Sequence, residues 1–288
     1  MAVTKTISEF KQDFVVNLEN KGRATATILA YKKDLEQLIE YLSGLDKADI
    51  PLIRPIDIEA FRDSLKANNY TDKSISRKLN AIKTFFSWLV SQKILENDPA
   101  GPVAHPHYEN PPPRILTRME YRALRDAARD DARISAIIEL MLQTGIRIGE
   151  VANLRMEDIQ DGKIAIKAYE SQPEREIPIN EPAKQALDQC LKIRPKAQIS
   201  HLFITKTGRP LLVRNIRSAI DRYFRESGIE SAKVNDLRNT FIAHQLKVGV
   251  DIVTVSKIAG HKRLSTTEHY LQFVEKSNGK RGAKLDEL

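Results

Sequence analysis

The stretch GKIAIKAYESQPEREIPIN, residues 162–180, differs in its hydrophobic pattern from the chain around it. Apolar and polar residues alternate on both sides of a polar turn, and this period of two is typical of half-buried strands. The pattern therefore predicts a β-hairpin. A third short strand is predicted at HLFIT, residues 201–205.

The segments on both sides of this hairpin have apolar residues at helical spacing instead. Thr117 with Glu120 three residues later is a capping-box pattern that predicts a helix start, and Gly145 predicts a helix end. Together they predict a mostly helical domain that carries a small antiparallel sheet. The helical segments are 116–130, 131–145, 182–193, 213–228, 236–249 and 251–260.

The first hundred residues contain four further segments with helical periodicity. Pro55 lies near the first turn of the third segment, and Thr71 is a suitable N-cap for the fourth. Four helices joined by short turns predict a small helical bundle. The four segments are 7–20, 25–44, 55–69 and 71–93.

A proline-rich stretch, NDPAGPVAHPHYENPPPR at residues 97–114, separates the two helical parts. Its six prolines and lack of helical period predict a stiff linker. We therefore expect two domains, residues 1–108 and 109–288, in a mainly α protein. His105 and His107 lie in the linker, and two isolated histidines there do not predict a metal site.

The chain is basic. Its 288 residues include 46 Lys and Arg against 38 Asp and Glu, a formal net charge of +8. Residues 1–108 are nearly balanced, with 15 Lys and Arg against 14 Asp and Glu, whereas residues 109–288 carry 31 against 24. A basic excess favours a polyanionic partner such as nucleic acid, but charge alone leaves that partner open.

Several classes of protein are disfavoured by what the sequence lacks. Cys190 is the single cysteine, so neither an internal disulfide nor a cysteine-rich metal site is expected, and its helical context indicates a packing residue. The sequence has no apolar run long enough for a transmembrane helix and no signal-peptide pattern at its start. We therefore expect a cytoplasmic protein without membrane association.

The fourth helical segment carries four cations: Lys73, Arg77, Lys78 and Lys83. Asp72 is the one acidic residue beside them, and the spacing places several of the cations on one helix face. Two interpretations remain open at this point. The face is either an ordinary solvated surface or one that lies along a phosphate backbone.

Three short basic motifs stand out in the second part of the chain. They are TGIRIGEV at residues 144–151, NDLRNTF at 235–241 and GHKRLSTTEHY at 260–270. Each is weak evidence alone, because an arginine near a helix end usually caps carbonyls and a single tyrosine usually packs at the edge of a core.

In this order the motifs resemble those of the tyrosine recombinase (phage integrase-like) family in its compact Xer-type form, and the resemblance covers the whole chain. It implies a SAM-like helical core-binding domain in front of the catalytic domain. It also implies that Arg147 and Arg238 clamp a scissile phosphate, that His261 donates a hydrogen bond to it, and that Tyr270 is the nucleophile. The further DNA contacts it implies are Arg175, Lys262 and Arg263, with the helix cations named above.

The chemistry implied by this resemblance is DNA strand exchange. Attack by Tyr270 produces a 3′-phosphotyrosyl link and a free 5′-hydroxyl, and the link keeps the phosphodiester energy. No cofactor, metal or ATP is therefore expected. The family acts on inverted binding sites, as a homodimer on one duplex and as a homotetramer that exchanges strands through a Holliday junction.

The sequence departs from the family pattern at two positions. Asn235 stands where the family has a histidine, and an asparagine side chain does not titrate. Glu170 stands where the family has a lysine that protonates the leaving oxygen. Lys167 and Lys206 are the candidates to replace that lysine, and His261 or water is the alternative.

These departures leave two hypotheses about function. The chain is either an active recombinase with an unusual proton path, or a DNA-binding architectural or regulatory protein of recombinase descent. The front helical domain argues against a type IB topoisomerase. The divergent site favours resolution of transposon co-integrates over replicon dimer resolution. The segment VEKSNGKRGAKLDEL, residues 274–288, either docks on a neighbouring protomer or is a frayed terminus.

Overall fold

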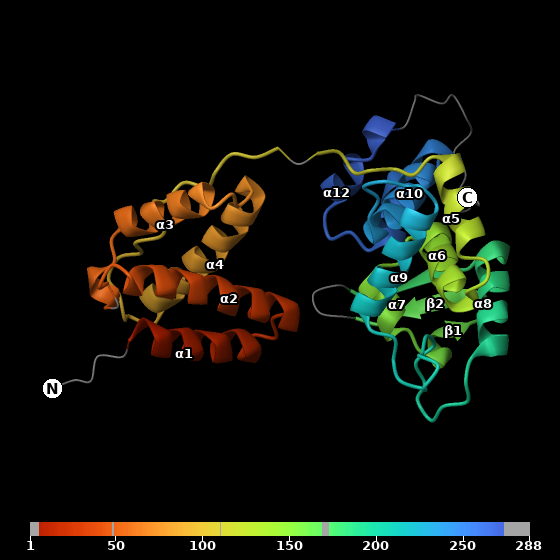
Figure 1. Ribbon diagram of the computed structural model, residues 1–288, viewed down its shortest axis with the longest axis horizontal. Helices are drawn as coiled ribbons and strands as arrows, with labels where there is room; N and C mark the ends of the chain where they lie inside the picture. The colour runs from red at the N-terminus through yellow and green to blue at the C-terminus, as the bar shows by residue number, and fades with distance from the viewer. Residues whose placement is uncertain (1–5, 48, 110, 169–172, 274–288) are drawn as a thin grey trace. The chain divides into compact units, whose positions relative to one another are not determined.

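The computed structural model of the chain describes residues 6–47, 49–109, 111–168 and 173–273. The chain divides into two compact units, Met1–Asn110 and Pro111–Leu288, so the division lies two residues beyond the predicted domain boundary. Each unit has its own hydrophobic core. The mainly helical fold with a small antiparallel sheet is confirmed (Figure 1).

The first unit is the predicted bundle of four helices. Its large buried side chains include Phe14, Phe85 and Phe86. The Phe14 and Phe85 rings pack edge-on, with their centroids 5.4 Å apart. The Thr71 side chain accepts a hydrogen bond from Ser74 N, as its N-cap position predicts. The helices are α1 (Ile7–Asn20), α2 (Thr25–Ser43), α3 (Pro55–Ala67) and α4 (Asp72–Ser91), with a 3₁₀ turn at Ile50–Leu52 (Figure 1).

The start of the proline-rich stretch is part of this first unit, not a free linker as the sequence predicts. Ala100 and Val103 are fully buried in its core. Lys83 Nζ of α4 donates to the carbonyl of Gly101 at 3.1 Å, and His105 Nδ1 is 3.0 Å from the Ser76 hydroxyl. Apolar side chains between the prolines therefore anchor the segment, which composition alone does not reveal.

The second unit contains eight helices among its described residues. They are α5 (Arg118–Ala127), α6 (Ala132–Thr144), α7 (Ile148–Asn153), α8 (Glu181–Ile193), α9 (Val213–Glu226), α10 (Val234–Lys247), α11 (Ile252–Ala259) and α12 (Leu264–Glu268). Single 3₁₀ turns occur at Met156–Asp158 and Leu271–Phe273. The predicted capping box at the start of α5 is present, since Thr117 and Glu120 exchange both hydrogen bonds.

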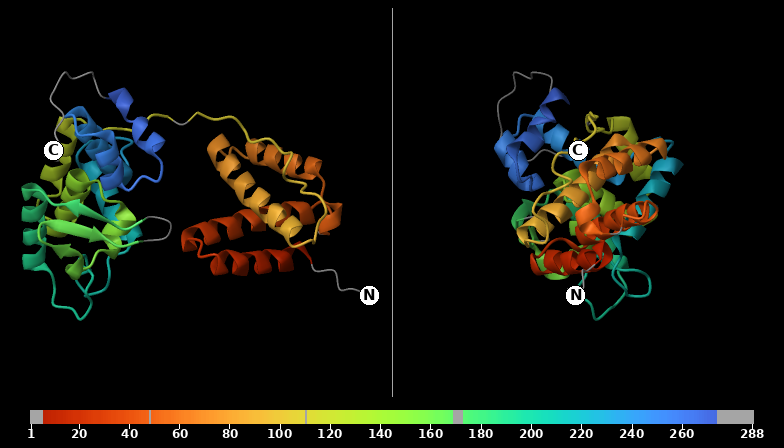
Figure 2. Two further views of the ribbon diagram at one scale, coloured as in Figure 1. Left: turned by 180° about the vertical axis from the view of Figure 1, so that it is seen from behind. Right: turned by 90° about the vertical axis from the view of Figure 1, so that its left-hand side faces the viewer.

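The sheet of the second unit confirms the predicted hairpin and corrects its third strand. Strands β1 (Ile159–Gln160), β2 (Lys163–Ile166) and β3 (Arg175–Pro178) are antiparallel in the order β1-β2-β3, with Ile164 opposite Ile177 (Figure 2). The prediction of a strand at 201–205 is wrong. Residues 201–205 form isolated β-bridges in place of a strand. The reason is a turn at which the chain folds back and Thr205 N donates a hydrogen bond to Arg209 O.

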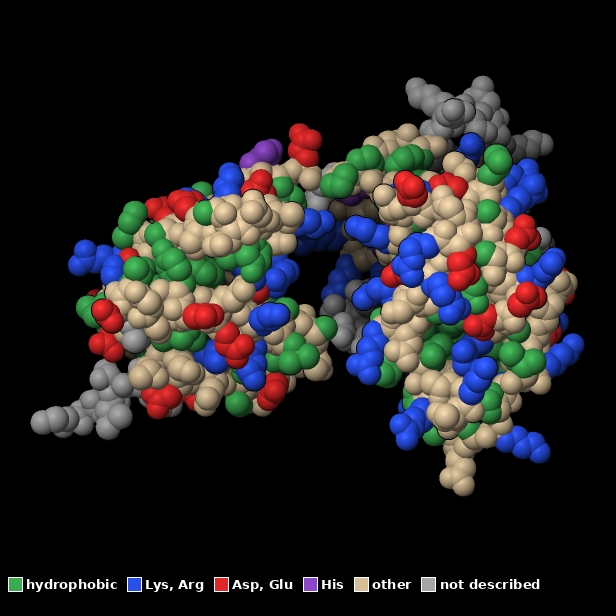
Figure 3. All heavy atoms as spheres, viewed as in Figure 1, with side chains coloured by type: hydrophobic (Ala, Val, Ile, Leu, Met, Phe, Trp, Pro, Cys, Tyr) green, Lys and Arg blue, Asp and Glu red, His purple; other side chains and the backbone are tan. Residues whose placement is uncertain are grey.

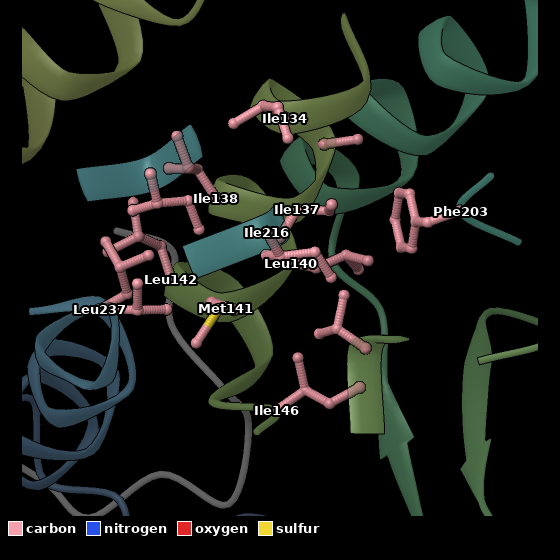
Figure 4. Close-up of a cluster of buried hydrophobic side chains, with 14 of the residues drawn as sticks. Ile134, Ile137, Ile138, Leu140, Met141, Leu142, Ile146, Phe203, Ile216 and Leu237 are labelled. Atoms are coloured by element: carbon pink, nitrogen blue, oxygen red, sulfur yellow. The ribbon is translucent and has the colours of Figure 1, made fainter. Parts of the chain in front are cut away.

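Helix α6 lies at the centre of the second core (Figure 4). It is apolar on several faces, and Ile137, Leu140 and Leu142 are fully buried. Ile216 of α9 and Leu237 of α10 pack in the same cluster. Cys190 of α8 is buried there as a packing residue, and burial raises the pKa of its thiol to about 11. The core thus fixes α6, whose C-terminal end begins the candidate site.

None of the described helices has both the length and the apolar character needed to traverse a lipid bilayer.

Candidate active site

The end of α6 places the first arginine of the site. Gly145 caps the helix with φ of +63°, a conformation that L side chains rarely adopt. A Cβ atom on Gly145 would lie 2.4 Å from Cδ1 of Phe241, so the close approach of α10 also requires glycine. The chain then turns so that Arg147 becomes the N-cap residue of α7.

Three guanidinium groups converge on the last carbonyls of α11. The hydrogen bonds run from Arg175 Nε to Ile258 O (2.7 Å), from Arg238 Nη2 to Ala259 O (2.5 Å) and from Arg147 Nη2 to Gly260 O (2.6 Å). The C-terminal carbonyls of a helix lack partners within the helix and carry partial negative charge, so cations stabilise them. Gly260, with φ of +64°, ends α11 at this point.

Glu150 on α7 balances part of this charge. Both of its carboxylate oxygens accept from Arg175, at 2.8 Å each, and Oε1 also accepts from Arg147 Nη1 at 3.1 Å. The Glu150 and Arg175 side chains are only 4% and 8% exposed. Burial acts to raise the pKa of Glu150, but the bonds from Arg175 and the Arg147 backbone outweigh it, and the pKa is lowered. Three arginines and one carboxylate leave the cluster positive.

Arg238 is the most deeply buried of the three arginines. Its guanidinium donates to two backbone carbonyls, those of Gly145 and Ala259. Burial and the nearby charge of Arg147 lower its pKa. A buried cation that is held by neutral carbonyls retains a strong preference for an anionic ligand.

His261 follows directly after Gly260 and is neutral at neutral pH. Burial, with the nearby charges of Arg238 and Arg147, lowers its pKa to about 4. Its Nδ1 atom lies 2.8 Å from the hydroxyl of the buried Thr267. A neutral imidazole has one donor and one acceptor nitrogen, so His261 offers hydrogen bonding without a net charge.

Tyr270 lies beside His261 and is mostly buried. The two rings stack with their centroids 6.3 Å apart and an interplanar angle of 18°. Tyr270 is 8% exposed, and its hydroxyl donates to Asn239 Oδ1 at 2.8 Å. Burial raises the pKa of the phenol, whereas Arg238 and Arg147 act to lower it.

Asn235, at the position of the family histidine, is exposed near the start of α10. Its Nδ2 atom donates to Asn239 Oδ1 at 3.0 Å. The structure therefore brings the four predicted residues Arg147, Arg238, His261 and Tyr270 into one region and connects Asn235 to it through Asn239. Their catalytic roles stay predictions.

The two lysine candidates have different surroundings, and Lys167 lines a cavity of about 200 Å³ together with Glu150 of the cluster. Lys167 is 64% exposed and pairs with Asp158 at 2.8 Å. Lys206 is exposed beside a cavity of about 290 Å³ whose lining includes Asp131 and Cys190 but none of the three arginines. Glu170, which replaces the family lysine, lies outside the described residues, as does the segment 274–288.

The predicted DNA contacts have different environments. Lys262 and Arg263 are exposed directly after His261, whereas Arg175 is held by Glu150 inside the cluster, which favours a positioning role. On α4, Lys73 is exposed, but Lys78 Nζ is 2.9 Å from Asp34 and its side chain is only 6% exposed.

The remaining α4 cations are also engaged within the unit. Arg77 is half exposed and contacts the same Asp34 carboxylate, and Lys83 bonds to Gly101. The four cations therefore do not form one free face, because Lys78 turns into the bundle. Their DNA contacts stay predictions.

Sequence reasoning missed three polar residues of the site: Glu150, Asn239 and Thr267. Glu150 had a detectable signal, since it stands three residues after Arg147, where a capping glutamate is common. Asn239 gave none, because its partner Tyr270 comes from another segment of the chain. Thr267 gave none either, because a single threonine six residues after His261 is not a distinctive pattern.

Comparison with known proteins agrees with this arrangement. Residues 114–276 match the phage integrase family, and residues 12–93 match the phage integrase N-terminal SAM-like domain. The tyrosine recombinase XerC of Thermodesulfovibrio yellowstonii is 30% identical over 279 residues, which cover 90% of this chain and 91% of the relative. The XerC of Roseiflexus castenholzii is 27% identical and covers 94% and 91%.

Solved structures share the fold at lower identity. A lambda integrase dimer bound to a COC′ core site matches with a TM-score of 0.76 at 17% identity, over 91% of this chain and 97% of that one. The Tn1549 transposon integrase in complex with transposon right end DNA matches with a TM-score of 0.78 at 17% identity, over 95% of this chain and 96% of that one. The matched family model, the XerC relatives and the shared fold together show that this chain belongs to the phage integrase family of tyrosine recombinases.

Proposed function

We propose that this chain is an active site-specific recombinase that cuts and rejoins duplex DNA through Tyr270. The observation that carries the proposal is the positive cluster at the end of α11, where three guanidinium groups lie close to the His261 ring and two of them, Arg238 and Arg147, also lie close to the Tyr270 phenol. A fixed set of cations around one position suits the charge that develops on a phosphorus atom under attack.

Each group has a defined part in the proposed reaction. Arg147 and Arg238 bind the non-bridging oxygens of the scissile phosphate, and Arg175 with Glu150 holds Arg147 in place. The Tyr270 oxygen forms a bond to phosphorus while the bond to the 5′-oxygen breaks. The leaving oxygen takes up one proton, and the phenol loses one. Religation reverses these steps.

The proton donor to the leaving oxygen is assigned to Lys167. It projects from the end of the β2 strand into solvent and contacts the carboxylate of Asp158. A phosphate backbone that approached this strand would compete with Asp158 for the ammonium group. Lys206, with its different surroundings, is the alternative donor.

The DNA substrate is proposed to be a duplex with inverted binding sites, bound by two protomers, with four protomers in the synaptic complex. Lys and Arg side chains are distributed over the visible face of the second unit, with acidic side chains among them (Figure 3). The lambda integrase structure described above is a dimer bound to a core site, and a further lambda integrase structure is a tetramer bound to a Holliday junction. Phosphate contacts would make binding weaken steeply with salt.

The proposed biological role is resolution of transposon co-integrates or of replicon dimers in the cytoplasm. The similarity to XerC proteins and the shared fold with a transposon integrase support a role of this general kind.

One observation favours a second candidate, a DNA-binding protein that no longer cuts. Tyr270 is mostly buried and hydrogen-bonded to Asn239, and Asn235 replaces the family histidine.

The two functions differ in whether a covalent protein–DNA adduct forms. Nuclease protection would first define the bound DNA segment, and a nicked substrate of that sequence would then trap any adduct. An adduct that is absent with Tyr270→Phe supports the recombinase, whereas binding without adduct supports the second candidate.

A further inference from the structure

Asn239 connects the predicted nucleophile to a buried polar network. Its Oδ1 atom accepts hydrogen bonds from the Tyr270 hydroxyl at 2.8 Å and from Asn235 Nδ2 at 3.0 Å. Its Nδ2 atom donates to Asp236 Oδ1 at 3.2 Å. Asn239 is itself buried on α10, one turn after Asn235. The carboxamide therefore has partners on both sides.

The carboxamide has one orientation that satisfies all three partners. A carboxylate can only accept, so the NH₂ group must face Asp236. Asp236 is fixed in turn, because its second oxygen accepts from Lys233 N at 2.8 Å, where it caps α10. The carbonyl oxygen of Asn239 consequently faces the phenol, and the phenol must be the donor.

A phenol that donates to a neutral acceptor is stabilised in its protonated form. The charged groups that face Tyr270 are Arg238 and Arg147, which favour ionisation, and Asp236, which opposes it. The stacked His261 ring is neutral at neutral pH. The hydrogen bond to Asn239 thus acts against the arginines, and the hydroxyl hydrogen is directed at Asn239.

We propose that Asn239 is a positioning residue that holds Tyr270 in a protonated resting state, and that DNA cleavage requires this hydrogen bond to be broken. This inference rests on the proposed function, in which Tyr270 is the nucleophile. Asp236 takes part by fixing the orientation of the Asn239 amide. The device would keep an unengaged protomer from attacking DNA.

The direct test measures the phenol pKa in protein without DNA. A fluorotyrosine at position 270 would be titrated by ¹⁹F NMR in the otherwise unchanged chain, in Asn239→Ala and in Asp236→Asn. Loss of one hydrogen bond that favours the neutral phenol should lower the pKa by about one unit in Asn239→Ala. Asp236→Asn should shift it in the same direction, and the asparagine amide oxygen can still accept the hydrogen bond from Lys233 N at the start of α10.

The matched control is Asn68→Ala. Asn68 is exposed in the first unit, and its side chain donates a hydrogen bond to the carbonyl of Ser64 at 2.8 Å. This variant should leave the titration unchanged. A pKa that stays at the wild-type value, or rises, in both Asn239→Ala and Asp236→Asn would overturn the inference.

Cleavage provides the second measurement. At a fixed pH below the phenol pKa, a fall of one unit increases the ionised fraction about tenfold. Single-turnover adduct formation by Asn239→Ala should therefore be faster, with its pH profile displaced to lower pH. If the pKa falls but no variant forms an adduct, the proposed function fails while the role of Asn239 stands. If an adduct forms but the phenol pKa and the pH profile are unshifted in Asn239→Ala, the proposed function stands and the role of Asn239 fails.

Discussion

Arg175 and Glu150 form an ion pair with two parallel hydrogen bonds, both of 2.8 Å, inside the second unit. The pair joins strand β3 to helix α7, and Arg175 Nε extends it to the carbonyl of Ile258 at the end of α11. Three elements that are distant in sequence are thereby fixed around Arg147. The position of the phosphate-binding arginine thus depends on residues that need not touch DNA.

Removing the charge of Glu150 should destabilise the fold. Glu150→Gln leaves Arg175 and Arg147 without their counterion and places a donor against a guanidinium, at a cost of about 3–5 kcal/mol. Urea denaturation would measure the loss. Glu157→Gln is the control, because the exposed Glu157–Arg155 pair at 3.7 Å should contribute less than about 1 kcal/mol. Equal effects of the two substitutions would contradict the assigned role of Glu150.

Glycine at the end of α11 is required for more than its backbone conformation. A Cβ atom on Gly260 would lie 2.9 Å from the Arg175 guanidinium, whereas one on Gly228, with a similar φ of +68°, meets nothing within 4 Å. Gly228→Ala should cost about 1–2 kcal/mol of backbone strain. Gly260→Ala should cost more and also slow cleavage, as single-turnover assays would show. Equal losses of stability with unimpaired cleavage would refute the contact.

The first two predictions concern the contacts of Glu150 and Gly260, which the sequence indicated only in part. The hairpin at 162–180 and the helices were predictable from local periodicity, and Gly145 from its place after an apolar helix. The resemblance implied that Arg147 and Arg238 meet at one phosphate, but it did not predict that they and Arg175 are held by backbone carbonyls at the end of α11, because carbonyls have no sequence signature. The burial of Lys78 had no local signal either, since its partner Asp34 lies on another helix.

The stability of the second unit should fall as the pH is lowered from neutral. His261 has a folded pKa of about 4, below its ordinary value of about 6.5, so between these values the unfolded chain binds more protons. The contribution of this group to the free energy of unfolding is therefore fully present above pH 6.5 and is lost as the pH falls toward 4. Urea titrations at several pH values should show that the free energy of unfolding depends less on pH in His261→Gln. His107→Gln, a change at an exposed linker residue, should retain the wild-type slope.

The leaving-group proton can be traced with a sulfur substrate. If Lys167 donates it, Lys167→Ala should slow cleavage of ordinary DNA by about 10²–10⁴-fold. A substrate with sulfur at the 5′-bridging position should restore the rate, because a thiolate leaves without a proton. Lys206→Ala serves as the comparison. Rescue of Lys206→Ala alone would move the assignment to Lys206, and rescue of neither would remove both lysines from the mechanism.

The cations of α4 should separate into two kinds by salt dependence. Exposed Lys73 would contact phosphate, so Lys73→Ala should reduce the slope of log binding constant against log salt by about 0.9. Lys78→Ala should instead lower the stability of the first unit, because it leaves Asp34 buried with one partner fewer. Fluorescence anisotropy over a salt series, with urea denaturation in parallel, distinguishes these. A reduced slope for Lys78→Ala at unchanged stability would disprove the separation.

The central claim is that Tyr270 attacks a phosphate held by Arg147 and Arg238, and mass spectrometry of a trapped protein–DNA adduct tests it most directly. The account predicts a nucleotide remnant attached through its 3′-phosphate to Tyr270, and no adduct from the Arg147→Ala or Tyr270→Phe variants. A remnant on any other residue, or an unmodified Tyr270 peptide in a protein that protects the same DNA, would contradict it.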